Sequence, residues 1–393
     1  MTSIEKFMQL RGNWNYPTAV HFGAGRIAEL PEAVRTAGMR RPLLVTDSVL
    51  AKLSMVMQAL NALAADGIQA ALFADIRPNP VESNITAGIA AYRAGGHDGV
   101  IAFGGGSALD AGKLIAFMHG QTRPVWDFED IGDWWTRANA SAIAPIVAVP
   151  TTAGTGSEVG RAAVVTNEAT HMKKIIFHPG MMPKVTICDP ELTLGMPPII
   201  TVGTGMDALA HCLEAYCAPF YHPLADGIAI EGIRLVKENL ARAVKGGGGD
   251  IEARAHMMAA ALMGATAFQK GLGAIHALSH PVGALHDTHH GLTNGVFMPY
   301  VLAFNRTAIE EQIARLAAYL GLKASFAAFL EWVLQLRAET AVPHTLRDLK
   351  VGNENGERIA QMAPEDPTAG GNPVPLDAAA ARAIFDAARA GRL

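Results

Sequence analysis

The sequence predicts an α/β domain followed by an all-helical domain. The chain has 393 residues, which is more than one ordinary hydrophobic core requires. Its first half alternates short apolar runs with helical segments, a pattern typical of a mainly parallel sheet. Its second half is rich in Ala, Leu and Met at helical spacing. Prolines 190, 197 and 198 mark the change. We therefore assign residues 1–190 to the first domain and 191–393 to the second, and expect the active site in the cleft between them.

The composition narrows the function classes. The chain has 32 basic and 36 acidic residues, a net charge of −4, and no long run of one sign. Such a balance argues against nucleic-acid and membrane-surface binding. The three cysteines form no CxxC pair, charges interrupt the N-terminal segment, and no apolar run reaches the roughly 18 residues of a spanning helix. We expect a soluble, cytoplasmic protein that binds neither nucleic acid nor membrane.

The elements follow one another in a regular order. In the first half we predict strands at residues 41–47, 70–73, 99–103, 144–149 and 185–188, with helices at 48–67 and 82–94. Ligand-binding loops in such sheets follow the carboxyl ends of the strands. In the second half we predict helices at residues 202–217, 225–244, 251–268, 308–319 and 376–390, a turn at 246–249 and a Pro/Gly loop at 365–375.

Residues 98–113, DGVIAFGGGSALDAGK, join a buried strand to a helix through three glycines. Residues without side chains let backbone N–H groups approach phosphate oxygens, and a helix N-terminus adds positive potential. We interpret Ser107 as the helix N-cap and Asp110 as its capping-box partner. The motif differs from GxGxxG, and a tight turn without a ligand is the alternative.

A second loop of the same kind, AVPTTAGTGSE, spans residues 148–158. Its hydroxyl groups could bond to phosphate, ribose or carboxamide, although such a loop is as often merely a capped turn. Two such loops at strand ends together favour a dinucleotide across the sheet edge. Asp47 closes another strand, where it could accept from a ribose hydroxyl and repel a 2′-phosphate, or simply stabilise the start of a helix.

Residues 271–294 hold five of the chain's 14 histidines. His276 and His280 are four residues apart and would share one face of a helix. Pro281, Gly283 and Gly291 would let the chain turn back and bring His290 near them. Imidazole is the commonest metal ligand, so we predict a metal site, with a solvated histidine-rich loop as the alternative.

Asp207 and His211 also share one helical face, in residues 204–216. Alone they would more readily form a hydrogen-bonded pair within helix packing. Together with His276 and His290 they give one carboxylate and three imidazoles, a donor set that suits Fe²⁺ or Zn²⁺.

With these motifs, the chain resembles the iron-containing (group III) alcohol dehydrogenases of the dehydroquinate synthase-like superfamily. The resemblance runs from about residue 22 to residue 300, and its motifs are specific only in combination. They are GGGSALDAGK at 104–113, PTTAGTGSE at 150–158, the lysine of HMKKIIFHP at 171–179, DPELTLGMPP at 189–198, GMDALAHCLEAY at 205–216 and the histidine stretch at 271–294, with a weaker echo in GGNP at 370–373.

The resemblance implies NAD or NADP in the first domain, Fe²⁺ or Zn²⁺ in the second, and a homodimer or larger homo-oligomer. It places Asp47 where the family prefers NAD over NADP, and His280 between metal and nicotinamide. The metal ligands it implies are Asp207, His211, His276 and His290. The residues assigned to the cofactor are Asp47, Gly105, Gly106, Ser107, Asp110, Thr151, Thr152, Thr155 and Lys173.

His286 departs from the family pattern, because relatives often carry an aromatic residue at this position. An imidazole there could donate a hydrogen bond to a polar or acidic substrate, or it could be a simple subfamily replacement. We therefore assign His280 to proton relay or substrate orientation and His286 to the border of the substrate, with His289 as a neighbour of the ligand His290.

The expected function is metal-dependent hydride transfer between a small alcohol, which could be polar, and NAD(P), reversibly giving an aldehyde or ketone. A metal-independent enzyme like maleylacetate reductase is an alternative, opposed by the intact ligand set. A lyase like dehydroquinate synthase should carry several basic residues near the metal motifs, yet residues 264–300 hold only Lys270. A non-catalytic metal- or nucleotide-binding protein is the third alternative, opposed by the presence of both cofactor loops.

Overall fold

A computed structural model describes residues 18–170 and 172–393. The described chain divides into two compact units, and the division falls between Met196 and Pro197. The sequence predicts the boundary after residue 190, and Leu192, just beyond it, packs into the apolar core of the N-terminal unit. The N-terminal segment that we expected to be non-secretory lies outside the described residues.

A six-stranded sheet organises the N-terminal unit, with the strand order β1-β8-β5-β4-β2-β3 and parallel pairing throughout. The predicted α/β class is therefore confirmed. The strands are β1 (Ala19–Phe22), β2 (Pro42–Asp47), β3 (Ala71–Ile76), β4 (Gly99–Gly104), β5 (Ile146–Pro150) and β8 (Val185–Cys188). A separate antiparallel hairpin of β6 (Ala162–Asn167) and β7 (Met172–Phe177) was not predicted.

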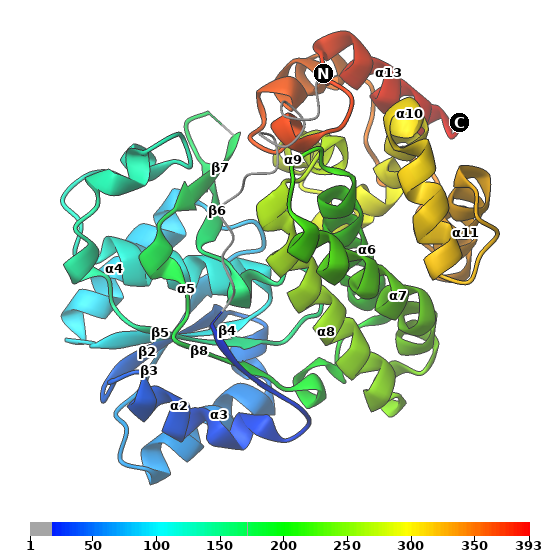
Figure 1. Cartoon of the computed structure of the whole chain (residues 1–393). Coiled ribbons are helices and arrows are strands. Elements are labelled where there is room, and N and C mark those ends of the chain that lie inside the picture. The colour runs from blue at the N-terminus through cyan, green and yellow to red at the C-terminus, as the bar shows by residue number, and fades with distance from the viewer. Residues whose placement is uncertain (1–17, 171) are drawn as a thin grey trace, which may run out of the picture. The chain divides into compact units, whose positions relative to one another are not determined.

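Helices cover both faces of this sheet (Figure 1). The central strand β4 is apolar along its whole length because it is buried on both faces. Val100 and Ala102 point into the core beneath α4 (Glu82–Ala94) and α5 (Gly106–Met118), whereas Ile101 and Phe103 pack into the other core with α2 (Leu30–Thr36) and α3 (Ser54–Ala65). Successive strand residues thus bury opposite faces.

The second unit has no β-strand among its described residues, so the predicted all-helical domain is confirmed. Its helices are α6 (Pro198–Cys217), α7 (Pro223–Lys245), α8 (Ile251–Ala267), α9 (Ala274–His286), α10 (His290–Tyr319), α11 (Phe326–Glu339), α12 (Gly356–Met362) and α13 (Ala378–Ala390). Helix α6 is buried over most of its circumference because α7, α8 and α10 all pack against it. Among the described residues, no helix combines the length and apolarity needed to cross a membrane.

Two expectations around the histidine stretch were wrong. Helix α9 continues through Pro281 and Gly283, where we expected a turn, and the chain turns instead at Asp287, whose φ is 49°. An internal proline costs about 3 kcal/mol, but Leu278 and Val282 on this helix are completely buried and offset that cost. Helix α10 begins at His290, well before the predicted residue 308.

The predicted helix at 48–67 is interrupted. A short 3₁₀ turn at Leu50–Lys52 precedes Leu53, which is extended, and α3 then runs from Ser54 to Ala65. The polar group that stabilises the turn is Asp47, whose Oδ1 accepts from the amides of Val49 and Leu50 at 2.8 and 2.9 Å. The start of the helical stretch is therefore set by the residue that closes β2.

Candidate metal and cofactor sites

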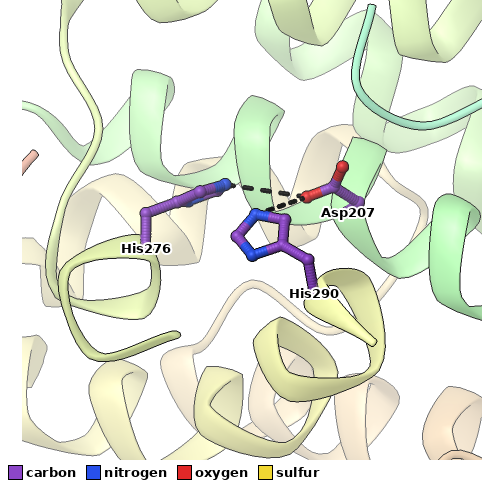
Figure 2. A group of neighbouring side chains, drawn as sticks. All are labelled: Asp207, His276 and His290. Carbon is purple, nitrogen blue, oxygen red and sulfur yellow. Dashed lines mark ion pairs between the residues drawn. The ribbon is translucent and has the colours of Figure 1, made fainter. Parts of the chain in front are cut away.

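Three helices of the second unit bring the predicted metal ligands together. Asp207 lies on α6, His276 in the first turn of α9, and His290 at the start of α10. The Oδ1 atom of Asp207 lies 3.6 Å from Nε2 of His276 and 3.5 Å from Nε2 of His290 (Figure 2). The ligand atoms that these three residues offer all lie within 4.8 Å of one another.

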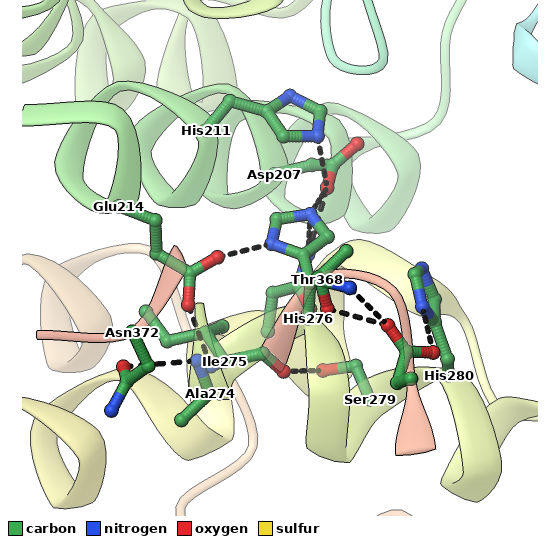
Figure 3. Close-up of polar contacts among 12 residues, drawn as sticks. Asp207, His211, Glu214, Ala274, Ile275, His276, Ser279, His280, Thr368 and Asn372 are labelled. Carbon is green, nitrogen blue, oxygen red and sulfur yellow. Dashed lines mark hydrogen bonds and ion pairs between the residues drawn. The ribbon is translucent and has the colours of Figure 1, made fainter. Parts of the chain in front are cut away.

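His211 approaches the same carboxylate oxygen along α6. Its Nε2 lies 3.7 Å from Asp207 Oδ1, as expected for residues four apart on one helical face. The His211 ring stacks on the His276 ring, with centroids 4.7 Å apart. Three imidazole nitrogens therefore surround one carboxylate oxygen: Figure 3 shows His211 and His276 beside Asp207, and Figure 2 shows His290.

This arrangement fits a divalent metal. In a tetrahedral site with ligand bonds of about 2.1 Å, neighbouring ligand atoms lie about 3.4 Å apart. The three separations from Asp207 Oδ1 fall between 3.5 and 3.7 Å, although the group of ligand atoms that all lie within 4.8 Å of one another comprises Asp207, His276 and His290 without His211. One carboxylate and three imidazoles also provide the mixed oxygen and nitrogen donors that iron and zinc accept.

The charged groups of this cluster shift one another's pKa values. Burial by itself would raise the pKa of Asp207, but His211, His290 and His276 outweigh burial and hold that pKa well below its usual range. Burial would lower the pKa of His276, but Glu214 and Asp207 raise it to about 9. Without a metal, the Asp207 carboxylate is therefore anionic at neutral pH and the His276 ring is protonated, so metal binding at His276 would release a proton.

Two residues that we had not predicted contact the ligands. Glu214 Oε2 lies 2.6 Å from Nδ1 of His276, and Asn294 Nδ2 donates to Asp207 Oδ1 at 2.8 Å. Each residue stands at a helical spacing from a predicted ligand, so a search for polar residues at that spacing could have found it. Glu214 comes seven residues after Asp207, and Asn294 four after His290, so each returns to the face of its ligand.

The two histidines assigned to catalysis have different surroundings. His280 Nδ1 lies 2.8 Å from Asp366 Oδ2, and its ring stacks on that of His290 with centroids 5.3 Å apart. His286 is the last residue of α9, and its Nε2 lies 3.4 Å from Nδ2 of Asn355. His289 instead serves as the N-cap of α10, where its Nδ1 accepts from the Leu292 amide at 3.4 Å.

In the N-terminal unit, the two glycine- and threonine-rich loops leave neighbouring strands. Gly104 at the end of β4 is in register with Pro150 at the end of β5. A Cβ atom on Gly106 would lie 2.5 Å from Thr155 Cγ2, so the two loops pack too closely for any side chain there. The structure thus brings the predicted cofactor residues of both loops to the same edge of the sheet.

The predicted capping box was wrong. Gly105 is the N-cap of α5, and no side chain bonds to the amides there. Ser107 lies inside the first turn. Asp110 accepts from Ser157 Oγ at 2.5 Å and from the Val164 amide at 3.0 Å, because its place one turn into the helix directs it toward the second loop and β6. These bonds join the two loops to the hairpin.

Behind these loops lies a buried group that the sequence did not reveal. Lys113 Nζ lies 3.3 Å from Asp110 Oδ1 and donates to the Ser157 and Ala162 carbonyls. Burial raises the pKa of the nearby Glu158 to about 7, despite the attraction of Lys113. Both side chains are almost fully enclosed, so we interpret them as supports of the loops.

Two further predicted cofactor residues lie on β2 and β7. Asp47 uses Oδ1 to stabilise the turn described above. Lys173 Nζ donates to Asn79 Oδ1 at 2.8 Å, whereas its neighbour Lys174 forms an ion pair with Glu129 at 3.0 Å. The two lysines therefore have separate partners, as expected for successive residues that face opposite sides of a strand.

Comparison with known proteins assigns both halves of the chain. Residues 17–190 match the family model of iron-containing alcohol dehydrogenases, and residues 201–389 match the C-terminal model of the same family. A 4-hydroxybutyrate dehydrogenase of Cupriavidus necator is 38% identical over 381 residues, covering 94% of this chain and 98% of the relative. A 1,3-propanediol dehydrogenase of Klebsiella pneumoniae is 35% identical over 367 residues, covering 91% and 93%.

The fold agrees with these sequence matches. A solved structure of a 1,3-propanediol oxidoreductase superposes with a TM-score of 0.90 at 35% identity, covering 96% of this chain and all of the other. The chain belongs to the iron-containing alcohol dehydrogenase family and is an alcohol oxidoreductase of that type.

Proposed function

We propose that this enzyme is an NAD-dependent alcohol dehydrogenase that uses Fe²⁺ held by Asp207, His211, His276 and His290. The observation that carries the proposal is the set of three imidazole nitrogens 3.5–3.7 Å from one oxygen of a buried carboxylate. Zn²⁺ accepts the same donors and is the alternative metal. A relative from Bacillus methanolicus that is 33% identical is named as an NAD-dependent methanol dehydrogenase, which supports the choice of cofactor.

The residues of the chain divide the work of the reaction. When bound, the metal supplies Lewis-acid polarisation of the substrate oxygen, and the nicotinamide supplies the hydride acceptor. Asp207 would offset one of the two positive charges of a divalent metal, which three neutral histidine ligands would leave uncompensated. His280, with Nδ1 anchored on Asp366, has Nε2 available to carry the proton of the alcohol.

We assign cofactor binding to the two loops at the sheet edge. The amides of Gly105, Gly106 and Ser107 begin α5 and present N–H groups and a helix N-terminus to a pyrophosphate. Thr151, Thr152 and Thr155 would provide hydroxyls along the dinucleotide, and Lys173 would serve the ribose. Asp47 disfavours a 2′-phosphate by its charge, so NAD is preferred over NADP.

We propose a short primary alcohol that carries a second polar group as the substrate. The relatives named for 4-hydroxybutyrate and 1,3-propanediol act on molecules of this kind. His286 places a ring nitrogen beside Asn355. Phenylalanine at this position would offer no hydrogen-bonding atom to a polar substrate. A homodimer or larger homo-oligomer and a cytoplasmic location remain predictions, and sedimentation velocity would test the first.

A substrate panel tests the proposal. Protein reconstituted without oxygen with Fe²⁺ or Zn²⁺ is assayed for nicotinamide reduction with 4-hydroxybutyrate, 1,3-propanediol and 1-butanol, using NAD and NADP. We expect faster turnover with the two polar alcohols and with NAD. His276→Ala should abolish turnover, whereas His344→Ala, an exposed histidine of the same unit, should leave it unchanged.

The same panel separates the rival enzymes. Full turnover by metal-free protein would replace this proposal by a metal-independent reductase of the maleylacetate type. The absence of any nicotinamide change with every alcohol, in protein that binds metal, would instead contradict the proposed reaction.

A further inference from the structure

Helix α9 begins without a capping side chain of its own. Its N-cap residue, Gly273, has none, and the first amides of the helix bond to side chains from distant segments. The Ala274 amide donates to Asn372 Oδ1 at 3.1 Å, and the Ile275 amide donates to Glu214 Oε1 at 2.6 Å (Figure 3). A carboxylate at this end of a helix is also favoured by the helix dipole.

Glu214 has a second contact with the next residue of the helix. Its Oε2 lies 2.6 Å from Nδ1 of His276, and the two side chains are 6% and 2% exposed. One carboxylate therefore binds the backbone of residue 275 and the ring of residue 276 together. The bidentate contact fixes both the place where α9 starts and the direction of the imidazole.

The contact also selects the tautomer of the ring. A carboxylate can only accept hydrogen bonds, so the His276 proton must lie on Nδ1 when the ring is neutral. The lone pair is then on Nε2, the atom that lies 3.6 Å from Asp207 Oδ1. A carboxylate that holds a ligating histidine in this way raises the basicity of the ligand.

We propose that Glu214 is the positioning residue of the metal site: it orients His276 and fixes its tautomer, while it shares with Asn372 the anchoring of the N-terminus of α9. The inference rests on the proposed role of His276 as a ligand. It adds, behind the ligand His276, a supporting residue that is not itself a ligand.

Asn372 lies in the GGNP segment at 370–373, so this segment also helps to anchor the N-terminus of α9. Asn372 exchanges hydrogen bonds of 2.8 Å with Asn305 and donates to the Val374 carbonyl at 2.7 Å, which fixes its amide. A Cβ atom on Gly273 would lie 2.8 Å from Asn372 Oδ1 and 3.1 Å from Glu214 Oε1. Glycine at 273 thus lets both side chains reach the helix end.

Glu214→Gln is the discriminating variant, because glutamine keeps the size of the side chain. Its amide oxygen can still accept from the Ile275 amide, but its NH₂ group then faces His276 Nδ1. That contact favours the proton on Nε2, where it blocks metal binding. We expect metal-free Glu214→Gln to keep a thermal midpoint near that of wild type, and to bind Zn²⁺ about 10- to 100-fold more weakly in chelator competition.

Asn372→Ala provides the matched control, since it removes the other anchor of α9 without touching His276. It should lower the thermal midpoint more than Glu214→Gln does, yet weaken Zn²⁺ binding less. The Co²⁺-loaded proteins give a second reading, because the visible spectrum should change in Glu214→Gln and stay close to wild type in Asn372→Ala.

Folded Glu214→Gln that binds Zn²⁺ within about twofold of wild type would overturn the inference. If that variant does not fold, Glu214→Asp replaces it, and it should weaken Zn²⁺ binding because its shorter carboxylate cannot span both partners. An aspartate variant with wild-type affinity would also contradict the inference. Failure of wild-type protein itself to bind Zn²⁺ would instead refute the proposed metal site, so the two failures are distinguishable.

Discussion

His280 Nδ1 and Asp366 Oδ2 lie 2.8 Å apart, and both side chains are largely buried. Asp366 is itself held by Thr368, whose Oγ1 and amide donate to its other oxygen at 2.6 and 2.9 Å. Burial would raise the pKa of Asp366, but His280 and Thr368 hold it below its usual value. An anionic acceptor therefore fixes the Nδ1 proton of the neutral His280 ring, so that Nε2 is the nitrogen that the proposed proton transfer would use.

Replacing that acceptor should slow the reaction. In Asp366→Asn the amide can offer an NH₂ group to His280 Nδ1, which favours the tautomer with the proton on Nε2. We expect kcat to fall on the order of 10²-fold, the lower end of what a positioned proton-transfer group contributes, with little change in KM. Steady-state kinetics on the metal-loaded enzyme measure both parameters.

Thr368→Val serves as the control for this pair. It removes one hydrogen bond to Asp366 but keeps the carboxylate, so kcat should fall far less. Equal losses in the two variants would show that the loop, and not the carboxylate, accounts for the effect.

The choice between NAD and NADP should depend on the charge of Asp47. Asp47→Asn keeps an oxygen that can accept from the Val49 and Leu50 amides, so the turn after β2 is preserved. Loss of the charge should improve kcat/KM for NADP relative to NAD by about tenfold, equivalent to about 1.4 kcal/mol.

Asp47→Ala separates the two functions of this residue. It should show the same change in cofactor preference together with a lower thermal midpoint, because the capping bonds are lost. An unchanged NADP/NAD ratio in Asp47→Asn would limit Asp47 to a structural role.

The buried Glu158 should make stability depend on pH. Its pKa is raised from 4.5 to about 7 by burial, so the folded state holds a proton that the unfolded state releases near pH 4.5. Stability is therefore lost as the pH rises from about 5 to about 7, on the order of 3 kcal/mol from this group.

Glu158→Gln removes this titration while keeping the side-chain volume. Its thermal midpoint relative to wild type should be higher at about pH 8 than at about pH 5. Calorimetric scans of both proteins across that range provide the comparison, and a difference that does not vary with pH would refute the assignment.

The sequence could identify the candidate ligands because each of the two motifs that hold them is local. Asp207 and His211 share a helical face by their separation of four residues, and the density of histidines identified the stretch with His276 and His290. The position of the turn between those two could not be predicted, since burial of Leu278 and Val282 carries the helix past Pro281. That outcome depends on packing with other helices.

The residues that support the ligands were harder to predict, because their contacts also depend on packing between segments that are distant in the sequence. Glu214 and Asn372 meet at the start of α9 although 158 residues separate them in the sequence (372 − 214). The hairpin of β6 and β7 was missed because its strands are only half-buried and so lack a continuous apolar run. The central strand β4, buried on both faces, was predicted to within one residue.

Metal titration of the turnover rate tests the central claim most directly. Chelator-treated enzyme receives increasing Fe²⁺ without oxygen, and bound metal and nicotinamide reduction are measured on the same samples. We predict that activity is absent at the start, rises in proportion to bound metal, and saturates at a single ion per chain, with Asp207→Asn losing both binding and turnover. Full turnover by the metal-free enzyme would contradict the account.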